Sequence, residues 1–293
     1  IASNVNQESF SMHAAASLKM TEKLYTALKL QFVTTSLSDQ TDPRPKTNAM
    51  RFEAKPGVVW RIDGRNNLGI AGNMGMYRSD ISHTIVNNLV NNVYFLMKGM
   101  GDNMQFTSSD VLSYPRDYKG TSIAGSAQWN TQSRGFSNLI ELNFSANNET
   151  ATDGGAAYTF KGGDYSARQI ALYDRFSFKT SDTFWHQLMM RAAYISDDGY
   201  WYDQRRVVDT QHANRVYYEV LNKSKVQNST YAQALLEYRL DKRHGKDAPV
   251  WTACVNGGVV SQQTTHYEAD IYKKKFNALN AEINFTRRWK WNS

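Results

Sequence analysis

The sequence predicts an all-β fold, specifically an antiparallel transmembrane β-barrel of roughly 12–14 strands joined as consecutive hairpins. Apolar and polar residues alternate in many runs, and alternate side chains of a strand point to opposite faces. The runs reach the roughly 9–11 residues that a tilted strand needs to cross a bilayer. Turn residues separate them, so that each hairpin takes about 20–25 residues, as in outer-membrane barrels. Residues 1–293 are expected to form a single domain.

The clearest run is residues 277–291. One parity is apolar and aromatic apart from Arg287, and it holds Leu279, Ala281, Ile283, Phe285, Trp289 and Trp291. The other parity is wholly polar, with Asn280, Glu282, Asn284, Thr286, Arg288 and Lys290. Such a two-sided strand is typical of a barrel wall between lipid and a polar interior.

Earlier runs repeat this pattern. Val58–Ile62 and Leu68–Met76 flank a short Gly/Asn turn, and Ile123–Trp129 and Ile140–Ala146 form a second predicted hairpin. Residues 1–18 are weakly periodic and are compatible with a strand, a plug segment or a tail. Polar and Pro-containing stretches predict loops or turns, namely Ser36–Thr47, Asp102–Tyr118, Asn147–Gly155 and Ser196–Gly199.

Composition narrows the class of protein. Hydrophobic residues make up 41% of the chain and the mean hydropathy is −0.59, which is too polar for a helical membrane protein. Aromatics reach 13%, which suits the aromatic girdles of a barrel. The net charge of +7 is spread along the chain, so a nucleic-acid partner is not predicted. The chain begins at Ile1, which predicts a removed signal peptide or a fragment.

No motif predicts catalysis, a metal or a cofactor. The six histidines are dispersed, and the single Cys254 excludes a cysteine-based zinc site. Neither a Gly-x-Ser-x-Gly elbow nor a His-Glu-x-x-His helix occurs. Gly162–Gly163 lacks the Gly-Lys-Ser/Thr of a phosphate loop and instead predicts a strand bulge.

Charged residues on the polar parity are the candidate lumen-lining set: Lys29, Arg61, Glu141, Arg175, Arg191, Glu237, Arg239, Glu282 and Arg288. They are expected either to select solutes or to fill the interior with salt bridges. Aromatics near run ends are the candidate membrane-interface set: Trp60, Trp129, Tyr200, Trp201, Tyr202, Trp251, Trp289 and Trp291.

With these runs in view, the chain resembles bacterial outer-membrane β-barrels. Phe285, Trp289 and Trp291 match the alternating aromatics of their last strand, although this chain ends in Asn292–Ser293. The Asn-rich turns and Tyr94–Gly101 look similar to an uncharacterised barrel family of Bacteroides-type bacteria. The resemblance implies a location in the bacterial outer membrane, with outer-membrane lipid and other envelope proteins as partners.

Three functions fit the pattern. The first is a passive, porin-like solute channel with a mixed-charge lumen, in which a basic interior would favour anions. The second is a non-conducting barrel that serves as a structural subunit of an envelope complex. The third is a soluble β-sandwich that binds carbohydrate, which the apolar parity of so many strands disfavours.

Overall fold

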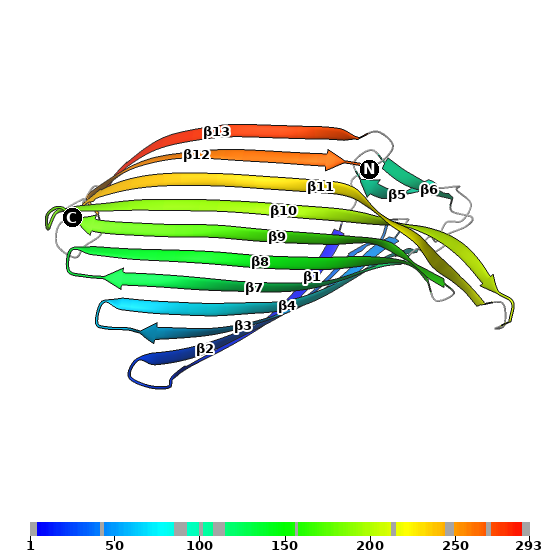
Figure 1. Cartoon of the computed structure of the whole chain (residues 1–293), viewed down its shortest axis with the longest axis horizontal. Coiled ribbons are helices and arrows are strands. Elements are labelled where there is room, and N and C mark those ends of the chain that lie inside the picture. Colours follow the sequence, from blue (N-terminus) through cyan, green and yellow to red (C-terminus); the bar gives the residue numbers. More distant parts are fainter. Residues whose placement is uncertain are drawn as a thin grey trace.

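The computed structural model describes residues 5–41, 44–84, 93–99, 102–107, 115–155, 158–211, 215–243, 249–267 and 271–288. These residues form two antiparallel sheets (Figure 1). The large sheet has eleven strands: β1 (Val5–Lys19), β2 (Leu24–Asp39), β3 (Arg44–Arg61), β4 (Asn66–Thr84), β7 (Arg116–Gln132), β8 (Phe136–Gly155), β9 (Tyr158–Lys179), β10 (Phe184–Asp209), β11 (Arg215–Lys242), β12 (Trp251–His266) and β13 (Tyr272–Arg287). The small sheet is a hairpin of β5 (Val93–Gly99) and β6 (Asp102–Thr107).

Strands of the large sheet lie side by side in sequence order, and only the β5–β6 hairpin interrupts the series, between β4 and β7. All ten pairings within the large sheet are antiparallel. The predicted all-β fold of consecutive antiparallel hairpins is therefore confirmed. Among the described residues, no helix is long and apolar enough to span a membrane.

The register sorts the side chains of the large sheet onto two faces. Directly paired residues point to the same side of a sheet. One row of paired residues crosses all eleven strands and is apolar except for one threonine: Leu18, Thr26, Val58, Ile70, Ala127, Leu142, Leu172, Ala192, Ala234, Val259 and Leu279. We call the side that carries this row the apolar face and the opposite side the polar face.

The polar face is the concave one. Buried side chains gather on it, including Asp39, Glu53, Asp153, Met189, Ser229 and Asp241. Large side chains on the apolar face splay outward instead, and Ile70, Met74 and Ile123 are each about 60% exposed. A curved sheet produces this difference because side chains converge on its inner side and spread apart on its outer side.

The two ends of the sheet differ. At one end, which we call the short-turn end, residues 20–23, 62–65, 133–135 and 180–183 connect neighbouring strands. At the other, the extended end, β10 and β11 continue as a paired hairpin out to Asp209 and Arg215 (Figure 1). Towards this end the apolar face of β8–β13 turns polar, at Asn148, Ser166, Asp198, Asn228, Thr265 and Lys273. Residues beyond that row lie outside the apolar band.

Closure is where the sheet differs from the predicted barrel. In the described residues β1 and β13 pair on one side only and do not contact each other, so the sheet is open. Val5–Lys19 is a strand paired along its whole length with β2. Of the three alternatives for residues 1–18, a strand therefore describes the part from Val5 onward, and residues 1–4 lie outside the described residues.

Several predicted loops were wrong. Strands β2 and β3 extend into Ser36–Thr47, β8 runs through Asn147–Gly155, and β10 runs through Ser196–Gly199. Part of Asp102–Tyr118 is strand as well, as β6 and the start of β7. Their polar composition resembles that of loops because the strands continue past the apolar band, where neither face needs apolar residues. The bulge predicted at Gly162–Gly163 is confirmed, since the β8–β9 register shifts there and Gly163 has φ of +152°.

Candidate functional site on the concave polar face

The candidate lumen-lining residues all fall on one side of the sheet. One paired row carries Arg61, Arg175, Glu237 and Glu282, and the adjacent row of that face carries Glu141 and Arg191. Lys29, Arg239 and Arg288 have the parity of the same face. The register thus gathers charges from strands far apart in sequence on the concave face, while their role in selecting solutes stays a prediction.

Towards the short-turn end of the polar face, in a region that we call the arginine rows and define by these two rows, arginines and carboxylates have different partners. The guanidinium of Arg61 lies 5.4 Å from the Tyr25 ring centre, and that of Arg191 lies 5.6 Å from the Tyr173 ring centre. Amide groups hold the carboxylates: Gln128 donates to Glu141 at 2.8 Å, and Asn284 donates to Glu282 at 2.8 Å. Within the described part of the chain, no salt bridge joins Arg61, Arg175 or Arg191 to a carboxylate.

Towards the extended end lies a second polar region, the mouth cluster, which comprises Tyr77, Arg116, Tyr118, Glu149 and Asp153 on the polar face and Asp164, Tyr202 and Lys223 on the opposite face, beyond the apolar band. Its innermost pair is bidentate, because Arg116 Nε and Nη2 donate to the two oxygens of Asp153 at 2.5 and 2.7 Å. Asp153 is fully buried. Burial alone would lower the pKa of Arg116, but the hydrogen bonds to Asp153 outweigh it and raise that pKa.

Asp164 is the hub of the outer part of the mouth cluster. Its Oδ2 accepts hydrogen bonds from Lys223 at 2.7 Å and from the Tyr202 hydroxyl at 2.5 Å, and its Oδ1 accepts from Thr150 at 3.0 Å. Burial would raise the pKa of Asp164, but these hydrogen bonds outweigh it and lower the pKa below its ordinary value. The Lys223 ammonium also lies 4.6 Å from the Tyr200 ring centre.

Glycines make room for this cluster. A Cβ on Gly120 would lie 2.1 Å from the Tyr77 ring, whose hydroxyl donates to Glu149. A Cβ on Gly162 would lie 2.4 Å from a carboxylate oxygen of Asp153. The bulge that brings Gly162 to this point therefore serves the buried ion pair. A small cavity of about 240 Å³ lies beside these residues and is lined by both Arg116 and Tyr165.

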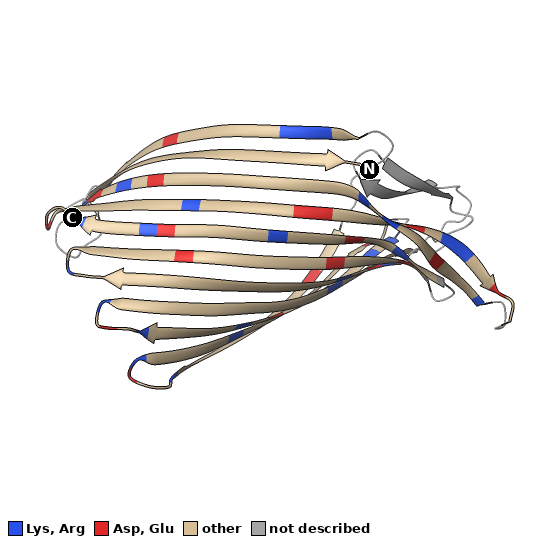
Figure 2. Ribbon diagram, in the orientation of Figure 1, with Lys and Arg blue, Asp and Glu red and all other residues tan. Residues whose placement is uncertain are grey.

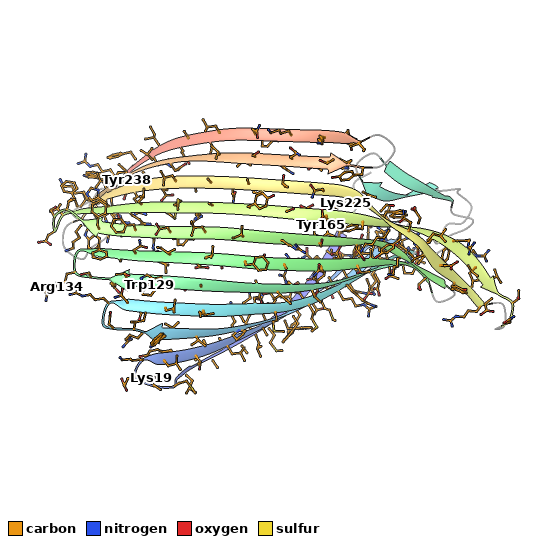
Figure 3. All side chains as sticks on the ribbon, viewed as in Figure 1. Lys19, Trp129, Arg134, Tyr165, Lys225 and Tyr238 are labelled. Atoms are coloured by element: carbon orange, nitrogen blue, oxygen red, sulfur yellow. The ribbon has the colours of Figure 1, made fainter. Side chains whose placement is uncertain are left out.

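The predicted interface aromatics separate into two groups. Trp60, Trp129 and Trp251 lie near the short-turn end, on the apolar face (Figure 3 labels Trp129). They belong to a belt of ring contacts that includes Phe184–Trp251, Trp251–Phe285, Phe178–His186 and Phe136–Phe176. Tyr200, Trp201 and Tyr202 lie towards the extended end, and Tyr202 is buried in the mouth cluster. Trp289 and Trp291 lie outside the described residues.

Charged residues are unevenly distributed along the strands (Figure 2). Most charged residues are drawn towards the ends of the strands, and long uncharged stretches cross the middle of the sheet. The mouth cluster was not predicted from the sequence, although Tyr202 belongs to the predicted interface aromatics. Its other members form no motif in the sequence, and only the adjacent glycines at 162 and 163 indicate the place.

Comparisons with known proteins give a family and a fold likeness. Residues 1–293 match the family of unknown function DUF6850. No curated protein matches the chain in sequence. Similar solved structures include the siderophore receptor PiuA from Acinetobacter baumannii, at 9% identity over 95% of this chain, with a TM-score of 0.48. The open form of the ferric-catecholate import receptor Fiu from E. coli K12 has 7% identity over 94% of this chain, with a TM-score of 0.48.

The monoaromatic hydrocarbon channel CymD shows 9% identity over 97% of this chain and 88% of its own, with a TM-score of 0.29. This chain spans 46% of the length of PiuA and 58% of that of Fiu.

Proposed function

The chain belongs to the DUF6850 family of unknown function, and we propose that it forms the wall of a passive solute channel in a bacterial outer membrane. The observation that carries the proposal is the apolar row that crosses all eleven strands, set against a charged opposite face. Lipid would cover the apolar face, and water and solute would pass along the concave polar face.

The contacts in the arginine rows support a preference for anions. Arg61 and Arg191 lie against tyrosine rings and Arg175 is exposed, and within the described part of the chain no salt bridge joins any of the three to a carboxylate. Such arginines lower the free energy of an anion that enters the passage.

The orientation follows from the two ends. Short turns face the periplasm and longer hairpins face outward in outer-membrane barrels. The short-turn end, with its tryptophan belt, would then lie at the periplasmic interface. The β10–β11 hairpin and the mouth cluster would lie at the outer surface.

The test is conductance of the purified protein in a planar bilayer, after its dependence on detergent has been established. We expect stable channels with anion preference. Two adjacent variants provide a control for lipid contact: Leu142→Asp on the apolar face should lower the yield of inserted protein, whereas Glu141→Gln on the polar face should leave insertion unchanged. A folded, detergent-dependent protein that never conducts would favour the structural-subunit function, and a protein that stays monodisperse without detergent would refute both.

A further inference from the structure

Within the part of the chain that the structure describes, both edges of the large sheet lack a neighbour. Strand β1 pairs only with β2, and β13 pairs only with β12, among the described residues. Apolar side chains on the edge strand are more exposed than their partners on the next strand. Leu279 on β13 is 81% exposed, whereas its partner Val259 on β12 is 51% exposed. Ile283 and its partner Val255 differ in the same way, at 80% and 50%. The side chains of the edge strand are apolar like those in the middle of the sheet, but a neighbouring strand covers them from one side only.

Strand β1 is not protected against pairing over its apolar length, and on β13 the only charge between Phe276 and Phe285 is Glu282, which faces the concave polar side. Edge strands that face water usually carry prolines, inward-pointing charges or bulges. Strand β1 has no proline, its pairing has no bulge, and no charged residue lies between Glu8 and Lys19. The lysines of β13 stand at its extended end, at positions 273–275. In hydrocarbon each unpaired backbone group costs several kcal/mol, so these edges cannot face lipid.

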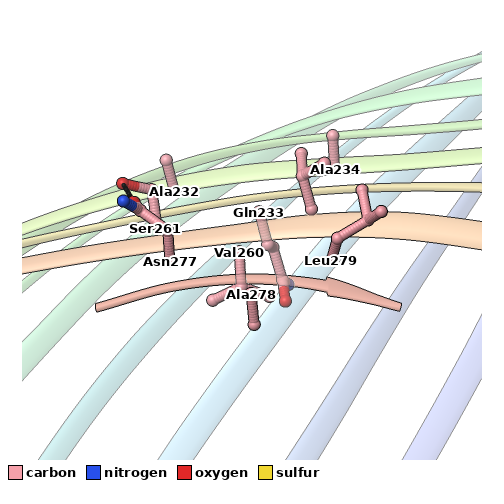
Figure 4. Close-up of a pocket in the computed structure, with 9 residues that line it drawn as sticks. Ala232, Gln233, Ala234, Val260, Ser261, Asn277, Ala278 and Leu279 are labelled. Carbon is pink, nitrogen blue, oxygen red and sulfur yellow. Dashed lines mark hydrogen bonds between the residues drawn. The ribbon is translucent and has the colours of Figure 1, made fainter.

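A hollow beside β13 also indicates that the apolar band reaches the edge of the sheet (Figure 4). It has a volume of about 540 Å³, and Ala234, Val259 and Leu279 of the apolar row line it. Figure 4 shows Ala234 and Leu279 pointing to the same side of the strands. The hollow continues the apolar band up to the edge of the sheet, so the band does not taper off at β13.

Strand direction limits what can close these edges. Ten successive antiparallel pairings make β1 and β13 run in the same direction. Direct pairing of β1 with β13 would therefore be parallel, and so would pairing with a second copy inserted in the same orientation. An inverted copy would pair antiparallel, but it would place its extended end on the opposite side of the membrane. An antiparallel closure therefore requires an odd number of additional strands, which makes the total even.

We propose that an odd number of further antiparallel strands, from the same polypeptide but outside residues 1–293, bridges β1 and β13 and closes the barrel. This inference rests on the proposed membrane location. The free edges are the first and last strands of a sheet in which every strand pairs with a neighbour in sequence, so adjoining polypeptide reaches them directly. The added strands continue the apolar face beside Leu18 and Leu279 and the polar face beside Lys19 and Asn280.

Photo-crosslinking of the native polypeptide in outer membranes tests the proposal. The photoreactive residue p-benzoylphenylalanine replaces Phe10 on β1 or Phe285 on β13, both exposed on the apolar face. The matched control is the same replacement at Phe144, which lies on the apolar face of β8 with paired strands on both sides. Heat-modifiable migration on gels confirms that each variant folds like the wild type.

At Phe10 and Phe285 we expect crosslinked peptides from the same polypeptide outside residues 1–293, with a yield similar to that at Phe144. At Phe144 the crosslinks should stay within β7 and β9. A crosslink between β1 and β13, a crosslink to a second copy or to another protein, or no crosslink at either edge would each overturn the proposal. Conductance is measured separately, so a closed barrel that does not conduct would refute the channel and leave this inference standing.

Discussion

The mouth cluster and the arginine rows carry similar residue types in different states. In the mouth cluster, the two principal cations each have a carboxylate partner, Asp153 for Arg116 and Asp164 for Lys223. In the arginine rows, Arg61, Arg175 and Arg191 have no such partner among the described residues. Paired charges fix a shape, and unpaired charges create a field for a passing ion. The difference predicts that substitutions in the mouth cluster change stability and that substitutions in the arginine rows change selectivity.

The largest effect is expected from Arg116→Ala. It leaves the fully buried Asp153 carboxylate without its cation, and breaking a buried pair in this way costs about 3–5 kcal/mol. Urea unfolding in detergent, followed by tryptophan fluorescence, measures the loss. The matched control is Arg205→Ala, whose partner Glu219 is exposed and whose loss should cost about 0–1 kcal/mol. Equal losses in the two variants would remove the distinction between a structural mouth and an ordinary surface.

A second effect is expected from Gly120→Ala. The new Cβ would overlap the Tyr77 ring and force it away from Glu149, at a cost of about 1–3 kcal/mol. The control on the same strand is Gly125→Ala, where the nearest atom to the new Cβ is 4.0 Å away. The same unfolding experiment compares them. If Gly120→Ala were as stable as the control, the packing of Tyr77 would not contribute to the mouth.

Selectivity is tested by changing Arg61, Arg175 and Arg191 to glutamine together. We expect the ratio of anion to cation permeability to fall roughly tenfold, equivalent to about 1.4 kcal/mol, with little change in stability. Reversal potentials in asymmetric KCl measure the ratio. The control is the double variant Lys223→Gln with Asp164→Asn in the mouth cluster, which removes both charges of an ion pair, leaves the net charge unchanged and should leave the ratio nearly unchanged. An equal drop in both variants would contradict the proposal that Arg61, Arg175 and Arg191 set selectivity while the mouth cluster contributes stability.

The smallest effect concerns pH. The pKa of Asp164 is lowered in the folded protein, so its stabilising contribution is complete above the ordinary carboxyl range and is lost as the pH falls below about 4. For this partly exposed pair we expect a loss of about 1 kcal/mol or less. Hydrogen exchange of residues 200–225, corrected for intrinsic rates, should quicken between pH 6 and pH 3 in the wild type. Asp164→Asn should abolish that dependence.

Alternation in sequence predicted the fold wherever a strand has one apolar and one polar face. Ile123–Trp129 and Ile140–Ala146 pair as expected, and so do the two strands around the 62–65 turn. The same rule failed at Asn147–Gly155 and Ser196–Gly199, where the strands have left the apolar band. Beyond that band, backbone pairing alone keeps them in the sheet, and their composition carries no periodic signal.

The candidate site could likewise be predicted from the sequence only in part. The parity of Arg175 or Glu237 could be predicted because the side chain period is local to one strand. The ion pairs of the mouth cluster could not be predicted, because Arg116 and Asp153 are 37 positions apart in the sequence, and Lys223 and Asp164 are 59 positions apart. Their meeting depends on register across several strands and on the bulge at Gly162. The Bacteroides-type origin and the interface role of Tyr200–Tyr202 stay predictions.

The order of the strands has a consequence for how the chain folds. Nearly every pairing in the large sheet joins two strands that follow each other along the chain, with the β4–β7 pair as the long-range exception. Most contacts therefore close only a short loop, and hairpins can be added one at a time without waiting for distant segments. The slow step in forming this sheet is then expected at β4–β7, where the chain must first make the β5–β6 excursion and return.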